Sequence, residues 1–354
     1  MRPSKQSNLF AMLLVATAVS CAPPPLVVNP FTDLQPLEFG GLPQPLTSQI
    51  TSLGCFSEGE VLEILVEASE DRSVYVMKLD SSRFDAGVII DGGPINEPFL
   101  HRVVEEGERF LFVDAPVGSI ATATIKAGRN DFRKPAGQAI VLEFATSFLV
   151  NGLFDPETND DDDRAFLIAI EPIVREGILE RLRKIFANTP VTFLKEHESR
   201  PRDSSRITFS GERVLGDDLD AVSVSGCPDQ VVFGSVLPRG SNVDAGNQRL
   251  NDEAVVYTGS FRTTGDCDAG FIINSTNNII NTLALSAGHE AGHLLGLNHT
   301  ALDGLMAAMP SQAFQRQLSF QRSQLVFDLG EGLEVFTNVI QDPQIYFDHI
   351  FPPD

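Results

Sequence analysis

The strongest constraint in this sequence is a set of histidines at fixed spacing between residues 289 and 299. His289 and His293 are four residues apart, so a helix would present both imidazoles on one face. Gly296 follows three residues later and can adopt a positive φ, which would end that helix and turn the chain. The turn would bring His299 back toward the other two. The spacing therefore predicts three histidine side chains around one point.

Three neutral imidazoles are a typical ligand set for a catalytic zinc ion whose fourth position stays open to water. Glu290 directly follows the first histidine and need not bind the metal. From that position its carboxylate could take a proton from the metal-bound water, as a general base. We therefore predict one Zn²⁺ ion held by His289, His293 and His299, with Glu290 as the catalytic residue.

The run from His289 to His299, written HExxHxxGxxH, resembles the signature of the metzincin zinc peptidases. Metzincins also carry a methionine in a tight turn beneath the ligands. Met306, in Gly304-Leu305-Met306, lies at a matrixin-like distance, and Met309 is the second candidate. The resemblance implies a zinc endopeptidase that acts on protein or peptide substrates, with Met306 supporting the ligands by packing.

An extended substrate would give affinity through backbone hydrogen bonds to an edge strand of the sheet. Residues 254–261 are the candidate for that strand, and a buried strand is the alternative for the same residues.

The pattern along the chain predicts an α+β protein in which a small all-β domain, of sandwich type, precedes a metzincin-like catalytic domain. The predicted divisions are a signal peptide over 1–20, a lipidated cysteine and Pro-rich tether over 21–55, a β-rich accessory domain over 56–148 and a zinc peptidase domain over 149–354. Short apolar runs broken by turn residues predict the β-rich domain, with a turn at Asp91–Pro94.

Apolar residues from 167 to 185 follow the helical period and predict a long helix, and a second helix is predicted over about 278–295. The intervening strands are predicted from short apolar runs at Val191–Leu194, Arg206–Phe209, Gln230–Phe233, Ala254–Tyr257 and Gly270–Ile273.

The acidic run Asp160–Asp163 allows two interpretations. It lacks the central glycine and the twelfth-position glutamate of an EF-hand loop, so a structural Ca²⁺ site is the weaker alternative. Acidic residues before a long helix favour a helix N-terminus.

The net charge of the whole chain is −22. A surface this acidic repels nucleic acid and anionic lipid, so both are disfavoured as partners.

The N-terminus has the features of an export signal. Arg2 and Lys5 precede an apolar stretch from Leu9 to Val19, which is short for a membrane span. The following Ala-Val-Ser-Cys21 is similar to a bacterial lipobox, which implies an exported lipoprotein at the outer membrane or cell surface, anchored only by lipid on Cys21. The alternative is an ordinary signal peptide and a secreted or periplasmic protein.

Four cysteines are present. If Cys21 carries lipid, three thiols remain and they cannot all pair within one chain. Cys227 and Cys267 both lie in the catalytic half, so they are the predicted disulfide, and Cys55 is left free.

Two rival functions remain. One is a surface adhesion or binding protein with an inactive peptidase domain. The other is a metallohydrolase that cleaves a non-peptide amide. The sequence does not determine the oligomeric state.

Overall fold

The computed structural model describes most of the chain after residue 49. The described residues are 37–38, 45–46, 50–68, 73–80, 83–113, 119–129, 132–157, 159–215, 221–222, 231–237, 243–261, 275–301, 304–307, 319–328 and 333–352. The predicted signal peptide, Cys21, Cys227, Cys267, Met309 and the strand predicted at Gly270–Ile273 lie outside them. Within the described ranges, no helix is both long and apolar enough to span a membrane.

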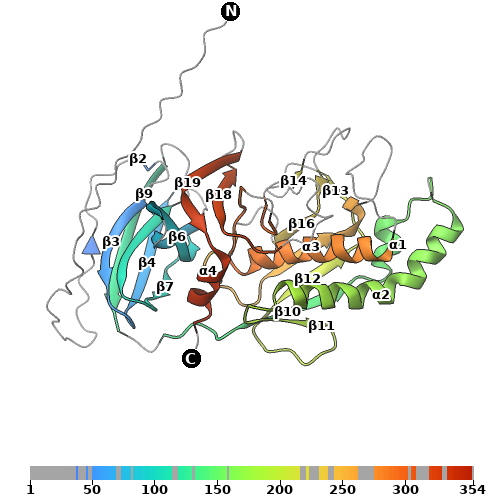
Figure 1. The fold of residues 1–354 in the computed structure, drawn as a ribbon, viewed down its shortest axis with the longest axis horizontal. Coiled ribbons are helices and arrows are strands. Elements are labelled where there is room, and N and C mark those ends of the chain that lie inside the picture. The colour runs from blue at the N-terminus through green and yellow to red at the C-terminus, as the bar shows by residue number, and fades with distance from the viewer. Residues whose placement is uncertain are drawn as a thin grey trace, which may run out of the picture.

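Two sheets form the N-terminal part of the fold (Figure 1). One has the order β1-β9-β4-β7, with β2 also paired to β9. Its strands are β1 (Leu37–Glu38), β2 (Pro45–Leu46), β4 (Val61–Ala68), β7 (Phe99–Arg102) and β9 (Ser119–Gly128). The other sheet has the order β18-β19-β6-β5-β8-β3. Its strands are β3 (Ile50–Phe56), β5 (Ser73–Asp80), β6 (Arg83–Pro94), β8 (Gly107–Val113), β18 (Ser323–Asp328) and β19 (Leu333–Gln341).

The two sheets share one hydrophobic core. In β4, Leu62, Ile64 and Val66 are buried at alternate positions, as expected for a strand with one face turned inward. They belong to the same apolar cluster as Val74 and Val76 of β5 in the other sheet. The alternating apolar pattern thus gives two sheets packed on one another, which is the predicted sandwich arrangement.

The predicted turn at Asp91–Pro94 is wrong, because these residues are the end of β6. They pair with the start of β5, where Val74 lies opposite Gly93. A Cβ atom on Gly93 would lie 2.3 Å from the ring of Phe99. The glycines that suggested a turn are instead required for close packing.

A third sheet has five strands in the order β11-β10-β12-β17-β16. Strands β10 (Gln138–Phe144), β11 (Val191–Lys195), β12 (Ser204–Ser210) and β17 (Glu253–Tyr257) run parallel, and β16 (Gly234–Leu237) is antiparallel to β17. A small separate sheet contains β13 (Val214–Leu215), β14 (Ala221–Val222) and β15 (Val231–Val232).

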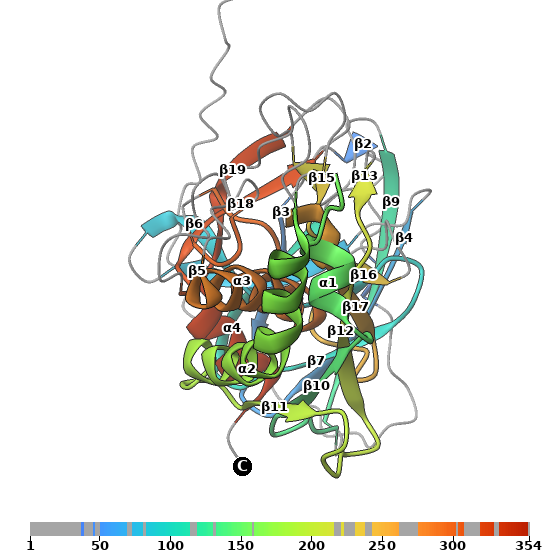
Figure 2. The same cartoon turned by 90° about the vertical axis from the view of Figure 1, so that its right-hand side faces the viewer.

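Two long helices lie together on one side of this five-stranded sheet (Figure 2). They are α2 (Asp161–Ile185) and α3 (Thr276–Leu294), both near the predicted limits. Asp160 caps α2 by accepting hydrogen bonds from the backbone N–H groups of Asp162 and Asp163, and Asp163 completes a capping box. The acidic run is therefore a helix N-terminus, as predicted. The shorter helices are α1 (Phe148–Leu153), a 3₁₀ turn at Thr258–Phe261 and α4 (Pro343–Ile350).

The sheets do not divide at the proposed domain limit between residues 148 and 149. Strand β10 precedes that limit, yet it lies between β11 and β12 in the third sheet. Strands β18 and β19 come after the limit, yet β19 pairs with β6 in the six-stranded sheet β18-β19-β6-β5-β8-β3, which we call the N-terminal sheet. Parallel pairing of distant strands is not recorded in local sequence patterns, so the boundary predicted from a change in those patterns differs from the division of the sheets.

The expectation that Cys55 is free is wrong. Cys55, in β3, is disulfide-bonded. The residues around Cys55 do not indicate which cysteine it pairs with. Disulfide connectivity depends on which segments the fold brings together.

Candidate metal centre

The structure brings the three predicted histidines to one point. The Nε2 atoms of His289 and His293 are 3.0 Å apart, and His299 Nε2 lies 3.1 Å from the first and 3.2 Å from the second. Helix α3 supplies two of the imidazoles from successive turns. Gly296, with φ of +90°, ends the helix and reverses the chain toward His299. These three side chains could hold a metal ion.

Backbone carbonyls fix the tautomers of the two helical histidines. His289 Nδ1 lies 2.7 Å from the carbonyl oxygen of Leu305, and His293 Nδ1 lies 2.7 Å from that of Leu297. A carbonyl only accepts, so each Nδ1 carries the proton and each Nε2 presents a lone pair. The Nε2 lone pairs of His289 and His293 therefore face one another over 3.0 Å and repel. A cation coordinated by both nitrogens would replace that repulsion with attraction.

Burial keeps His293 and His299 in the neutral form that binds metal. It lowers the pKa of His293 to about 4, against the smaller effect of its bond to Leu297. Burial also lowers the pKa of His299 well below its usual value, and the neighbouring imidazoles add to that shift. At neutral pH both rings are uncharged and their Nε2 lone pairs are available.

The geometry fits a small tetrahedral ion. Zn–N distances of about 2.0–2.1 Å at tetrahedral angles place two ligand nitrogens roughly 3.3–3.4 Å apart. The observed separations of 3.0–3.2 Å are only slightly shorter. Three imidazoles, two of which have Nδ1 atoms bonded to backbone carbonyls, are a donor set that zinc accepts.

Glu290 lies beside this centre with 2% of its surface exposed. Its carboxylate packs against β16 at Gly234. A Cβ atom on Gly234 would lie 2.3 Å from Glu290 Oε1 and 2.6 Å from Cδ. Gly234 therefore provides the space that the carboxylate occupies, a role that no pattern in the sequence indicated.

The turn that follows His299 supports the centre in two ways. Leu305 accepts the His289 hydrogen bond through its backbone carbonyl. Met306 is buried against the helix, since a Cβ atom on Gly292 would lie 2.3 Å from its Sδ atom. The backbone N–H of Thr300 donates to Met306 O over 2.7 Å and closes the turn. Met306 thus contacts α3 by packing at Gly292, next to His293 in the chain.

The strand proposed for substrate does not lie at an edge. Strand β17 is placed between β12 and β16, and residues 258–261 form the buried 3₁₀ turn. The alternative of a buried strand is therefore correct. In the described part of this sheet the edge strand on that side is β16, which contains Gly234 and so lies against Glu290. The sequence could not show that β16 rather than β17 lies at the edge, because edge position depends on long-range strand pairing.

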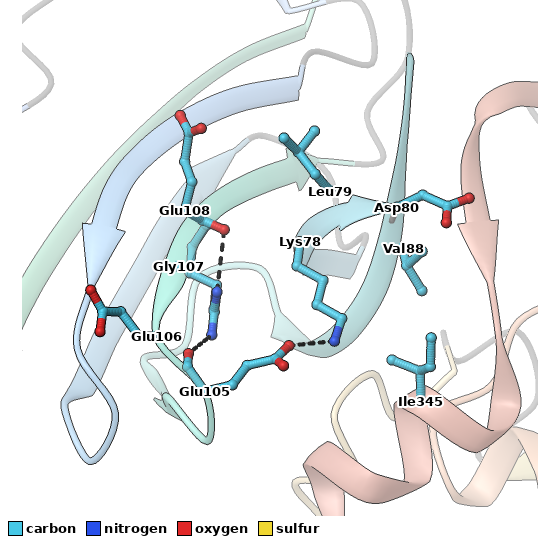
Figure 3. Close-up of a pocket in the computed structure, with 10 residues that line it drawn as sticks. Lys78, Leu79, Asp80, Val88, Glu105, Glu106, Gly107, Glu108 and Ile345 are labelled. Atoms are coloured by element: carbon cyan, nitrogen blue, oxygen red, sulfur yellow. Dashed lines mark hydrogen bonds and ion pairs between the residues drawn. The ribbon is translucent and has the colours of Figure 1, made fainter. Parts of the chain in front are cut away.

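A cavity of about 310 Å³, which none of the three converging histidines lines, lies where the N-terminal sheet faces α4 (Figure 3). Lys78 and Glu105 point toward one another across it and form an ion pair, and Ile345 of α4 closes one side. Asp80 at its margin is paired with Arg322. This cavity contains none of the predicted site residues, and it marks the seam between the N-terminal sheet and α4.

No known protein family model matches the chain, and no curated protein matches it. Three solved structures illustrate the distant structural similarities. Archaemetzincin from Archaeoglobus fulgidus, complexed with malonate, has 18% identity, covers 52% of this chain and 96% of its own, and has a TM-score of 0.26. The SPBc2 prophage-derived protein YomS has 15% identity, covers 29% and 100%, and has a TM-score of 0.20. A family two carbohydrate esterase from Clostridium thermocellum has 8% identity, covers 47% and 60%, and has a TM-score of 0.17. With TM-scores this low, none of these likenesses supports an argument about fold or function.

Proposed function

We propose that this protein is a zinc-dependent endopeptidase of the metzincin type. The observation that carries the proposal is the convergence of three Nε2 atoms within 3.2 Å of one another, with two of their rings oriented by backbone carbonyls. Zinc bound there would supply an activated water and polarise the scissile carbonyl.

The roles of the protein side chains follow from their places. His289, His293 and His299 would hold the ion through Nε2. Glu290 is buried beside them and acts as the general base, taking a proton from the attacking water. The same carboxylate then delivers that proton to the nitrogen of the leaving amine. Burial excludes competing water from the carboxylate, and Gly234 keeps its place open.

Strand β16 replaces β17 as the proposed substrate strand. Its position at the described edge of the sheet would let an extended peptide add to it by backbone hydrogen bonds. Gly234 in this strand contacts Glu290, so a peptide bound along β16 would pass beside the proposed base.

The test measures zinc stoichiometry and cleavage of a peptide library on the same preparations. His289→Ala, His293→Ala and His299→Ala should each lower zinc occupancy, whereas Glu290→Gln should retain zinc. Cleavage by Glu290→Gln should fall by about 10⁴-fold, because general-base help is typically worth about 10²–10⁴ and this residue also donates the proton.

Each rival function predicts a different result. Zinc occupancy without cleavage of any peptide by the wild-type protein would favour an inactive binding protein. Mass-spectrometric products that derive only from non-peptide amides would favour the other hydrolase. Full zinc occupancy in all three histidine variants would overturn the site itself.

A further inference from the structure

Asn298 is the residue between two groups that hold the metal centre. On one side is Leu297, whose carbonyl oxygen accepts the hydrogen bond from His293 Nδ1 over 2.7 Å. On the other side is His299, whose Nε2 atom is one of the three converging nitrogens. The backbone position of Asn298 therefore influences two of the three imidazoles.

Three hydrogen bonds hold Asn298, and all of them come from the N-terminal sheet. Gln341 of β19 accepts from the Asn298 N–H through Oε1 over 2.8 Å and donates from Nε2 to the Asn298 carbonyl over 2.9 Å. Tyr75 of β5 donates its hydroxyl to Asn298 Oδ1 over 3.0 Å. All three residues are buried, and Gln341 is completely inaccessible. Buried polar groups paired in this way strongly favour one arrangement of the turn.

Gly296, two residues before Asn298, is also tightly enclosed by neighbouring segments. A Cβ atom there would lie 2.1 Å from the Tyr346 hydroxyl of α4 and 2.7 Å from the carbonyl oxygen of Asp244. Tyr346 accepts a hydrogen bond from the N–H of Gly246 over 2.8 Å. The chain that reverses after α3 is thus enclosed by a C-terminal helix and by the loop that contains Asp244 and Gly246.

That loop rests in turn on the N-terminal sheet. Gln248 donates from Nε2 to the carbonyl oxygen of Gly92 in β6 over 3.1 Å. A Cβ atom on Gly92 would lie 2.8 Å from Cβ of Ala245, so the two backbones approach closely. Next to Gly92, the fully buried Asp91 is held by Lys134 and by His101 Nδ1, the latter over 2.7 Å. The support for Gly296 therefore continues into β6.

We propose that Tyr75 and Gln341 are positioning residues for the metal centre, acting through Asn298, and that the N-terminal sheet is a required part of the peptidase. The inference rests on the proposed function. Strand β5 comes from the N-terminal segment and β19 from the C-terminal segment, and both belong to one sheet with β6 between them. Removal of the N-terminal strands would expose Asn298 and loosen the centre, so their proteolytic loss inactivates the protein.

The experiment compares zinc release in the full chain. Tyr75→Phe removes only the hydroxyl, and Gln341→Met removes both amide hydrogen bonds at similar length. Each zinc-loaded variant is mixed with a chromophoric chelator, and the rate of zinc transfer is measured. Thermal unfolding of the zinc-free protein is recorded in parallel. Direct partners of ligating histidines typically contribute 10- to 100-fold in metal affinity. Tyr75 and Gln341 act one residue further out, through Asn298, so each variant should release zinc at the lower end of that range, about tenfold faster.

Phe112→Leu is the matched control. Phe112 is buried in β8 and its ring stacks on Tyr75 with centroids 6.0 Å apart. The replacement loosens the same packing but leaves the hydroxyl in place. It should lower the unfolding midpoint without accelerating zinc release more than about twofold. Acceleration equal to that of Tyr75→Phe would show general loosening and overturn the proposal.

A double variant tests whether Tyr75 acts through Asn298. If it does, Tyr75→Phe should add nothing to zinc release once Asn298→Ala is present. Fully additive effects, or unchanged release in both Tyr75→Phe and Gln341→Met, would overturn the positioning role while wild-type zinc binding stands. A wild-type protein that binds no zinc would overturn the proposed function, and this inference with it.

Discussion

The sulfur atom of Met306 lies where a side chain at Gly292 would have to be placed. A Cβ atom on Gly292 would be 2.3 Å from Met306 Sδ and 2.9 Å from Cε. Gly292 directly precedes His293, so this contact packs the turn containing Met306 against the helix that carries the ligand. Protein interiors are closely packed, so a larger residue at position 292 would displace the Met306 side chain.

Gly292→Ala should therefore lower the stability of the zinc-free protein by about 1–3 kcal/mol, the usual cost of overpacking. In an unobstructed helix the same change is worth about 1 kcal/mol in the opposite direction. Gly288→Ala is the control one turn earlier, where the nearest atoms are the flexible ends of Leu305 and Leu182 at 3.3 Å and beyond. Thermal unfolding in the presence of a chelator measures both. Equal midpoints for the two variants would contradict the packing relationship.

Met306→Leu nearly conserves volume and should cost less than about 1.5 kcal/mol. Because the role assigned to Met306 is packing, zinc should remain bound and activity should fall only modestly. The measurement is zinc content after dialysis. Loss of the metal from this variant would show that Met306 does more than pack.

Gly234→Ala should disable the proposed base without removing the ligands. The new methyl group would lie 2.3 Å from Glu290 Oε1, so the carboxylate must move. We expect normal zinc content and a fall in kcat/KM of about 10²-fold or more, within the range for loss of a general base. In a Glu290→Gln background the same change should have little further effect. A large additional loss there would mean that Gly234 acts on substrate binding instead.

The carboxyl group of Asp252 should make the protein less stable as pH rises. Burial, opposed by a hydrogen bond from Ser205 and reinforced by nearby Asp244, raises the pKa of Asp252 to about 8 from a usual value of 3.8. Between those values the folded protein binds more protons than the unfolded chain, so the free energy of unfolding falls with rising pH.

Asp252→Asn keeps the shape of the neutral acid and the acceptor for Ser205, and it removes this ionisation. The unfolding free energy of the variant relative to wild type should therefore be higher at pH 8.5 than at pH 5. Urea unfolding at the two pH values measures the difference. A difference that is independent of pH would show that Asp252 titrates normally.

The disulfide at Cys55 makes two of our predictions mutually exclusive. With four cysteines in the chain, a Cys227–Cys267 bond leaves only Cys21 to pair with Cys55. A Cys21 sulfur that carries lipid cannot form that bond. Lipidation of Cys21 therefore requires Cys55 to pair with Cys227 or Cys267.

A non-reducing peptide map of protein isolated from membranes, combined with mass spectrometry of the N-terminal peptide, distinguishes these arrangements. We expect Cys55 in a cross-linked peptide and only one of the two features, lipid on Cys21 or a Cys227–Cys267 bond. Finding both features in one molecule would contradict the bonded state of Cys55. Cys55→Ser should destabilise the protein by about 2–5 kcal/mol, as is typical for loss of a native disulfide.

The sequence by itself determined the elements that depend on local periodicity and on fixed spacing. The histidines four residues apart, the glycine three residues later and the third histidine place three imidazoles together because helix geometry relates nearby residues directly. The long helix beginning after Asp160 follows from its cap and its apolar period, which are also local.

Only the tertiary structure decided which distant groups complete the centre. The carbonyls of Leu297 and Leu305 orient two histidines, but every residue has a carbonyl, so no residue type marks them. The space at Gly234, the position of β17 inside its sheet and the pairing of β19 with β6 depend on long-range strand order. The bond from Tyr75 to Asn298 joins residues 223 positions apart, a relationship that arises only when the N-terminal sheet packs against the turn after α3.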